Sequence, residues 1–140
     1  MNKFLSILAA CLGLLILAAC APANEPAQTG SIQGIEWQWR SVTEQGSTTT
    51  VPNPENYTIE FNENGTFSGK ADCNSISGTY SQENGFTITL GPSTMAFCGE
   101  ASLDVVYLDL LSNVVAGGPD GAGGLALETA GGAQRMLFES

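Results

Sequence analysis

Apolar and polar side chains alternate with a period of two through the first half of the chain that follows residue 31. The apolar members of the three clearest runs are Ile35, Trp37 and Trp39; Tyr57, Ile59 and Phe61; and Phe67, Gly69, Ala71 and Cys73. A period of two places every second side chain on the same face of a β-strand. Asn64-Gly65 lies between the last two runs, and both residues tolerate the positive φ of a tight hairpin turn. The pattern therefore predicts an antiparallel meander with one apolar face.

The stretch from Glu100 to Val115 follows a different period. Its apolar residues are three and four positions apart, which defines one face of an amphipathic helix; they are Leu103, Val106, Tyr107, Leu110, Leu111 and Val114. We expect Gly117-Gly118-Pro119 to end this helix, because glycine favours the C-terminal cap and proline cannot continue the helix. Alternation returns at Leu125 and again over Arg135–Glu139, where Met136 and Phe138 should point inward.

These elements predict an α+β fold. About seven strands should form an antiparallel, partly barrel-like β-sheet that one amphipathic helix plugs or covers. The domain should occupy residues 32–140, a length that can bury one hydrophobic core. The glycine-rich run from Gly117 to Gly124 is interpreted as a mobile connection, because it lacks a phosphate-binding pattern.

The first 19 residues have the pattern of an export signal. Phe4 to Leu17 is a mostly apolar run that is too short to span a bilayer, which needs roughly 20 residues, and it has the length of a signal-peptide core. It leads into Leu17-Ala18-Ala19-Cys20, which resembles the lipobox of bacterial lipoproteins. We expect a signal peptide over residues 1–19, a lipid on Cys20 and a flexible linker up to residue 31. An ordinary secretory signal with an incidental cysteine is the alternative.

The charge of the chain narrows the choice of partners. Four basic and fourteen acidic side chains give a formal net charge of −10, and loss of Lys3 with the signal would leave −11. Such a domain is repelled by phosphate backbones and anionic lipid head groups, so we expect no nucleic-acid partner. A basic protein, peptide or cation is favoured, with outward-facing acids such as Glu36 and Glu60 as contacts. The alternative is that the acidity serves only solubility.

The sequence contains no specific catalytic or metal-binding motif, and none of its many carboxylate pairs stands out; an enzyme would need a cleft with convergent carboxylates. The chain has no histidine, the commonest general base and metal ligand. If Cys11 leaves with the signal and Cys20 carries lipid, two cysteines remain, too few for a zinc site. We expect no enzyme activity, no cofactor and no metal. Asp72 is either a buried acid or a solvent-facing strand residue. Trp37 and Trp39 form either a stacking platform or part of the core.

Cys73 and Cys98 are the two cysteines that remain. Export would deliver them to an oxidising compartment, which favours a disulfide between them. Closing a loop of about 26 residues would stabilise the fold by roughly 3.5 kcal/mol. Two buried thiols are the alternative, while a reactive thiol would need a nearby cation, and only Lys70 is close to Cys73 in sequence.

The motifs taken together resemble the META domain family, whose members include HslJ-like envelope proteins. The resemblance rests on Gly69-x-x-x-Cys73-Asn74-x-x-x-Gly78-x-Tyr80, on Thr94-Met95-Ala96-x-Cys98 and on the closing run from Gly132 to Phe138. The family usually has glycine where this chain has Asp72. The resemblance implies an antiparallel, partly barrel-like sheet with one helix, and an architecture similar to that of small lipid-binding pilotin lipoproteins.

The same resemblance implies no catalytic residues and a role in envelope stress or drug tolerance. We therefore expect a non-enzymatic envelope lipoprotein that is tethered to the membrane through Cys20 and has a binding or stress-tolerance role. Ala21 after Cys20 favours the outer membrane, if the cell has one, and the domain would face the periplasm or the exterior. The alternative is a pilotin-like or inhibitor-like module that binds an acyl chain or a basic protein.

Overall fold

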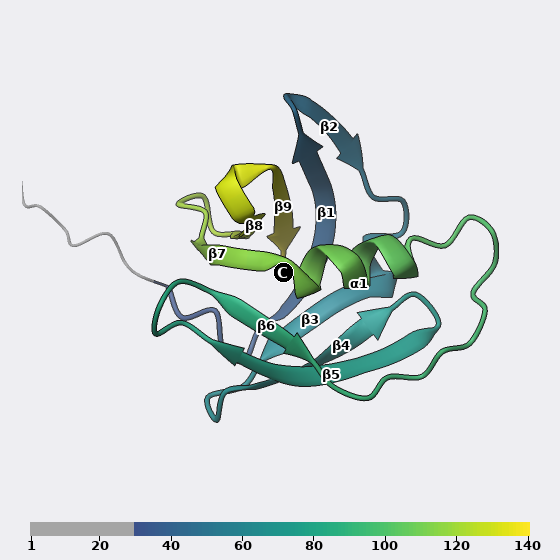
Figure 1. Ribbon diagram of the computed structural model, residues 1–140, viewed down its shortest axis with the longest axis horizontal. Helices are drawn as coiled ribbons and strands as arrows, with labels where there is room; N and C mark the ends of the chain where they lie inside the picture. Colours follow the sequence, from purple (N-terminus) through teal and green to yellow (C-terminus); the bar gives the residue numbers. More distant parts are fainter. Residues whose placement is uncertain (1–29) are drawn as a thin grey trace, which may run out of the picture.

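The computed structural model describes residues 30–140 (Figure 1). The predicted signal peptide, Cys20 and most of the predicted linker lie outside the described residues. The described part forms nine strands, one α-helix and two short 3-10 helices. In chain order they are β1 (Glu36–Glu44), β2 (Ser47–Thr50), η1 (Pro54–Asn56), β3 (Tyr57–Phe61), β4 (Thr66–Ala71), β5 (Asn74–Ser81), β6 (Thr87–Leu90), α1 (Asp104–Ser112), β7 (Val114–Pro119), β8 (Leu125–Thr129), η2 (Ala130–Gly132) and β9 (Gln134–Glu139).

The strands form one antiparallel sheet that curls into a nearly closed barrel. Their order is β6-β5-β4-β3-β1-β9-β8-β7, with β2 paired to β1 alone. The two end strands meet where the N–H of Phe86, just before β6, donates a hydrogen bond of 2.9 Å to the carbonyl of Val115 in β7. Gly85 has a φ of 102°, and a Cβ there would lie 2.7 Å from the same carbonyl oxygen, so glycine permits this approach. The predicted α+β fold with a partly barrel-like antiparallel sheet is confirmed.

The core fills the interior of the barrel. Trp37 and Trp39 are only 4% and 1% exposed, which excludes the interpretation of this pair as a surface stacking platform. The ring of Trp39 stacks on Tyr107 of α1 with centroids 5.2 Å apart, and Tyr57 meets both rings edge-on. Met136 and Phe138 of β9 are buried, as their alternation predicted. Aromatic packing therefore joins the helix to strands from both halves of the chain.

Helix α1 is shorter than the predicted helix and lies across the front of the barrel in Figure 1. Tyr107, Leu110 and Leu111 point into the core as expected, but Val106 is 49% exposed. The helix ends at Ser112, and Val114 already belongs to β7.

The prediction that Gly117-Gly118-Pro119 ends the helix was wrong, because these residues pair with β8. Gly117 packs closely there, since a Cβ would lie 2.5 Å from the side chain of Leu127 and 3.1 Å from the carbonyl oxygen of Ala126, so a larger residue would force Leu127 to move. The interpretation of Gly117–Gly124 as a mobile connection is corrected by the same finding. Only residues 120–124 connect β7 to β8, and they form a hydrogen-bonded loop.

Two hairpin turns illustrate what alternation can and cannot detect. Asn64-Gly65 turns the chain between β3 and β4 as predicted, with Gly65 at a φ of 79°. The β1–β2 hairpin turns at Gln45-Gly46, where φ is 48° and 80°. Its second strand is fully exposed, so Ser47–Thr50 carries no apolar alternation and was not predicted.

The hydroxyl of Tyr107 provides a test of the core. It is buried and has no hydrogen-bond partner among residues 30–140, and burial raises the pKa of the phenol well above its ordinary value. We expect Tyr107→Phe to leave the free energy of unfolding unchanged or to raise it by up to about 1–3 kcal/mol, because an unsatisfied polar group is removed. Leu111→Ala, the control in the same helix, should lower it by about 2–5 kcal/mol. Denaturant unfolding measures both, and a Tyr107→Phe loss as large as that of Leu111→Ala would contradict the packing described.

Candidate functional site

The disulfide joins the turn between β4 and β5 to the long loop that precedes α1. Cys73 and Cys98 are bonded, with their Cα atoms 5.6 Å apart, as the sequence predicted. Cys98 lies in the segment from Gly91 to Leu103, which connects β6 to α1 and which we call the anchored loop. Cys73 lies in the two-residue turn rather than in the strand that the alternation had extended to it.

Asp72 is the other residue of that turn, and neither interpretation of it was right. It is half-buried, with a φ of 58°, in the left-handed region that glycine occupies most easily and aspartate tolerates. A glycine would therefore fit this position without strain. The carboxylate of Asp72 accepts a hydrogen bond of 3.2 Å from the hydroxyl of Tyr57.

Asn74 is the side chain that holds the anchored loop most closely. It is 3% exposed, and its amide pairs with the backbone of Ala96 in both directions. The N–H of Ala96 donates to its Oδ1 at 2.8 Å, and its Nδ2 donates to the carbonyl of Ala96 at 3.0 Å. Nδ2 also lies 3.3 Å from the carboxylate of Asp104 at the start of α1. The apolar pattern alone assigned Asn74 no role, although this residue shares the inward face of β5 with Ile76. A buried amide needs hydrogen-bond partners.

The start of α1 is fixed by the same region. The N–H of Leu103 donates a hydrogen bond of 2.9 Å to the hydroxyl of Tyr57, which in turn reaches Asp72. The hydroxyl of Ser102 accepts the N–H of Asp104 at 3.2 Å and donates to that residue's carboxylate at 3.1 Å, which ties the end of the anchored loop to the first residue of the helix. The turn, the anchored loop and the helix start therefore form one connected network.

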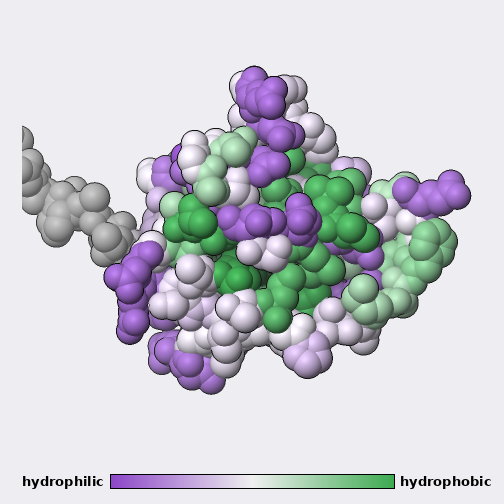
Figure 2. All heavy atoms as spheres, viewed as in Figure 1, coloured by the Kyte–Doolittle hydropathy of each residue, from purple (hydrophilic) through white to green (hydrophobic). Residues whose placement is uncertain are grey.

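This network supports a surface with large apolar side chains. Met95 and Phe97 are 82% and 84% exposed on either side of Ala96, whose backbone Asn74 holds. A groove of about 430 Å³ lies between the anchored loop and α1, and Val105 and Leu108 of the helix help to line it. Figure 2 shows apolar surface over α1 and along the loop beside it. The acids Glu100 and Asp104 line the same groove, and its lining includes no lysine or arginine from the described chain.

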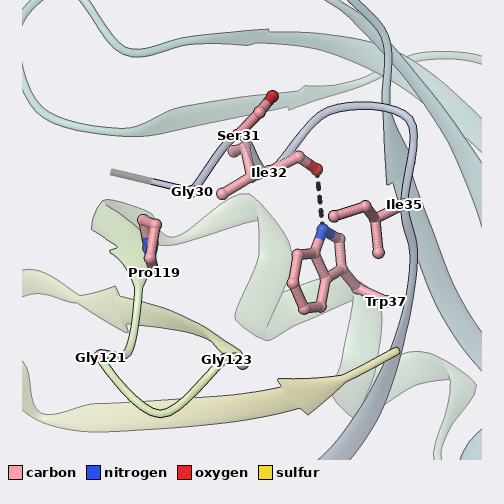
Figure 3. A pocket seen from close by; sticks show the side chains of 9 residues that line it. Gly30, Ser31, Ile32, Ile35, Trp37, Pro119, Gly121 and Gly123 are labelled. Atoms are coloured by element: carbon pink, nitrogen blue, oxygen red, sulfur yellow. Dashed lines mark hydrogen bonds between the residues drawn. The ribbon is translucent and has the colours of Figure 1, made fainter. Parts of the chain in front are cut away.

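A second hollow lies where the described chain enters the barrel, at the side chain of Trp37 (Figure 3). It measures about 290 Å³ and is bounded on the other side by Pro119 and the glycine-rich loop. The indole N–H of Trp37 already donates to the carbonyl of Ile32 at 2.8 Å. None of the described residues that line this hollow is charged, so it offers little to orient a ligand.

No group of three or more acidic or cysteine side chains among residues 30–140 is placed to hold a metal ion. No helix in this part of the chain is both long enough and apolar enough to span a bilayer.

Comparison with known family models identifies the family. The sequence model of the META domain matches residues 30–140, which include the disulfide, Asn74 and the anchored loop. The chain belongs to the META domain family. This confirms the family that the motifs indicated, and HslJ-like lipoproteins are the standard context of this domain. Membership suggests an envelope-associated protein without a catalytic role.

Two solved structures share the fold of this META domain. A DUF4847 family protein from Bacteroides vulgatus is 14% identical and has a TM-score of 0.59, over 77% of this chain and 93% of that chain. A protein from Burkholderia xenovorans, solved by NMR, is 21% identical and has a TM-score of 0.62, over 99% of this chain and 97% of that chain. At these identities the likeness shows the fold alone. Comparison with curated protein sequences gave no match.

Asn74→Ala tests the anchor. The substitution removes both hydrogen bonds to Ala96 in a single step, and each is worth about 1 kcal/mol. We expect the free energy of unfolding to fall by about 2 kcal/mol. Thr94→Ala is the matched control, because it removes one exposed hydrogen bond, from the N–H of Ser75, in the same loop. Chemical denaturation of the oxidised proteins measures both, and equal losses would show that Asn74 has no special part in holding the loop.

Asp120 gives a pH-dependent test of the loop between β7 and β8. The N–H groups of Ala122 and Gly124 donate to its carboxylate at 2.7 and 2.8 Å, and these bonds lower the pKa of Asp120. Its stabilising contribution is therefore present above the unfolded pKa of about 3.9 and is lost as pH falls through the folded pKa. In Asp120→Ala, amides 122 and 124 should exchange with solvent faster than in the unmodified chain at pH 6.

Carboxyl-carbon NMR titration measures the pKa of Asp120 directly, and we expect a value below the ordinary one. The exchange difference between Asp120→Ala and the unmodified protein should shrink as pH falls. A titration at or above the ordinary aspartate pKa would show that the two hydrogen bonds do not favour the carboxylate in solution.

Proposed function

We propose that this protein is a membrane-tethered envelope lipoprotein whose META domain binds a partner and does not catalyse a reaction. The lipobox at Cys20 supports the tether, and the family supports the envelope. The observation that carries the binding role is the pair of large apolar side chains, Met95 and Phe97, that an internal network holds in solvent. Its physiological setting, in this proposal, is envelope stress tolerance.

A pilotin-like module that holds an acyl chain between helix and sheet is less well supported. Trp39, Tyr107 and Leu111 fill that space and are at most 1% exposed, so the interface is a packed core. The apolar groove lies instead between α1 and the anchored loop. An open surface groove suits a protein or peptide segment better than an acyl chain, which binds best where most of its surface is buried.

The charge of the mature chain defines how such a partner would be met. With a net charge of −11 after loss of Lys3, the domain attracts basic proteins and repels nucleic acid and anionic lipid. Encounter rates with a basic partner rise at low salt and fall as the Debye length shortens to about 10 Å at 0.1 M. The lipid on Cys20 would restrict the search to the membrane surface, and Ala21 favours the outer membrane where a cell has one.

Cys20→Ala tests the tether. Without the lipidated cysteine, the protein should move from the membrane fraction to the soluble fraction, because the proposed tether is the lipid on this side chain. The measurement is cell fractionation followed by immunoblotting, with membranes washed in high salt and mild alkali. Cys73→Ser is the control, since it removes a different cysteine and should leave the protein with the membranes. A Cys20→Ala protein that stays bound through both washes would contradict the lipoprotein assignment.

A further inference from the structure

We propose that the apolar surface of the anchored loop is the docking site for a basic, partly apolar segment of a partner protein. This loop surface consists of Met95 and Phe97 with the adjoining groove, lined by Val105 and Leu108 and edged by Glu100. The inference rests on the proposed binding role and adds where the partner contacts the domain and what chemistry it presents.

The exposure of these side chains is not explained by the fold. Met95, Phe97 and Val105 are 82%, 84% and 73% exposed, so none of them contributes much to the core. Burying a side chain of this kind is worth about 1.5–3 kcal/mol. Large apolar side chains that gather on one surface are typical of sites for protein interaction. Aromatic and methionine side chains are also enriched at the centres of interfaces.

The loop that carries these side chains is held in place before any partner arrives. The disulfide fixes Cys98, and Asn74 fixes Ala96 between Met95 and Phe97. The N–H of Thr94 donates to the carbonyl of Ser75, and the N–H of Ser75 donates to the hydroxyl of Thr94. Restricting a loop in its binding conformation lowers the entropy cost of association. The network therefore fits a surface that is organised for binding.

Charge selects the chemistry of the occupant. Glu100 and Asp104 line the groove with no basic side chain beside them in the described lining. Two of the three basic residues of the described chain are engaged elsewhere, Arg40 with Glu139 at 3.1 Å and Arg135 with Glu128 at 2.6 Å. A lysine or arginine of the partner would pair with Glu100 or Asp104, and an apolar side chain next to it would contact Val105 and Leu108.

The same observations disfavour a membrane as the occupant. An acidic rim is repelled by anionic head groups. In Figure 1 the start of the described chain and the anchored loop lie at opposite ends of the long axis. A domain tethered through the segment that precedes residue 30 can therefore present the loop away from the bilayer. A second copy of the chain is disfavoured as well, because it would carry the same negative charge.

Photo-crosslinking in living cells tests the proposal on the full chain. The probe is p-benzoylphenylalanine, placed at Phe97 or Met95, with Thr49 and Glu63 as exposed control positions on other parts of the barrel. We expect a discrete protein adduct from positions 97 and 95 and none from the controls. Mass spectrometry should place the crosslink in a partner segment that contains lysine or arginine beside apolar residues.

The crosslinked segment, made as a synthetic peptide, completes the test. It should bind the mature Cys20→Ala protein, with an affinity that falls at least about tenfold in Phe97→Ser, as expected for an anchoring aromatic residue. Glu100→Gln should weaken binding and reduce its salt dependence. The charge control is the double variant Glu36→Gln, Glu60→Gln, whose residues pair with each other across β1 and β3. It should weaken binding less than Phe97→Ser or Glu100→Gln does.

Each other outcome overturns the inference. A lipid adduct would assign the loop to the membrane, and an adduct with a second copy would assign it to self-association. A protein adduct from the control positions alone, or a peptide whose affinity is unchanged in Phe97→Ser, would place binding elsewhere while leaving the proposed binding role intact. Absence of any adduct from all four positions would reject the loop and the binding role together, whereas the tether is tested separately by Cys20→Ala fractionation.

Discussion

The exposed surface of this META domain depends on one buried amide. The side chain of Asn74 pairs with the N–H and the carbonyl of Ala96, much as a neighbouring strand would. An amide can do this because it carries a donor and an acceptor side by side, whereas a carboxylate would offer no donor and an aliphatic side chain neither. Because Asn74 is 3% exposed, leaving it unpaired would be costly. The sequence of β5 thus fixes the position of a loop more than twenty residues away.

The disulfide and the amide hold the same loop by different physical means. In the chain-entropy account, the bond between Cys73 and Cys98 acts mainly by restricting the unfolded chain. The hydrogen bonds of Asn74 act only in the folded state. The loop runs past the end of β6 and reaches α1 without a strand partner of its own beyond Thr94. These two attachments, together with the Tyr57–Leu103 hydrogen bond, replace the strand pairing that the rest of the barrel has.

Sequence analysis predicted the parts of the fold in which one face of an element is buried. Trp37, Trp39, Met136 and Phe138 alternate because the barrel has an inside, and Tyr107 and Leu111 recur because α1 packs against it. The pattern failed where burial does not decide the residue type. Strand β2 is wholly exposed, and β7 contains two glycines, of which Gly117 lies against Leu127, so neither strand carries an apolar period.

The candidate site was only partly accessible from the sequence. The pairing of Cys73 with Cys98 was predicted because only two cysteines remain in the domain and because export would deliver them to an oxidising compartment. The exposure of Phe97 did not, because a side chain in an irregular loop has no period that reveals its direction. The role of Asn74 could have been suspected because it lies two residues from Ile76 and so on the same inward face of β5. Its partner, Ala96, is defined only by the three-dimensional path of the loop.

Amide hydrogen exchange at Ala96 tests the central claim most directly. If Asn74 holds the loop in the folded state, the amide of Ala96 should stay protected when Cys73 and Cys98 are both changed to serine, provided that the protein remains folded. The same amide should exchange much faster in Asn74→Ala with the disulfide intact, while amides in β4 keep their protection. The reverse result, with protection lost in the serine variant and retained in Asn74→Ala, would show that the disulfide alone positions the loop.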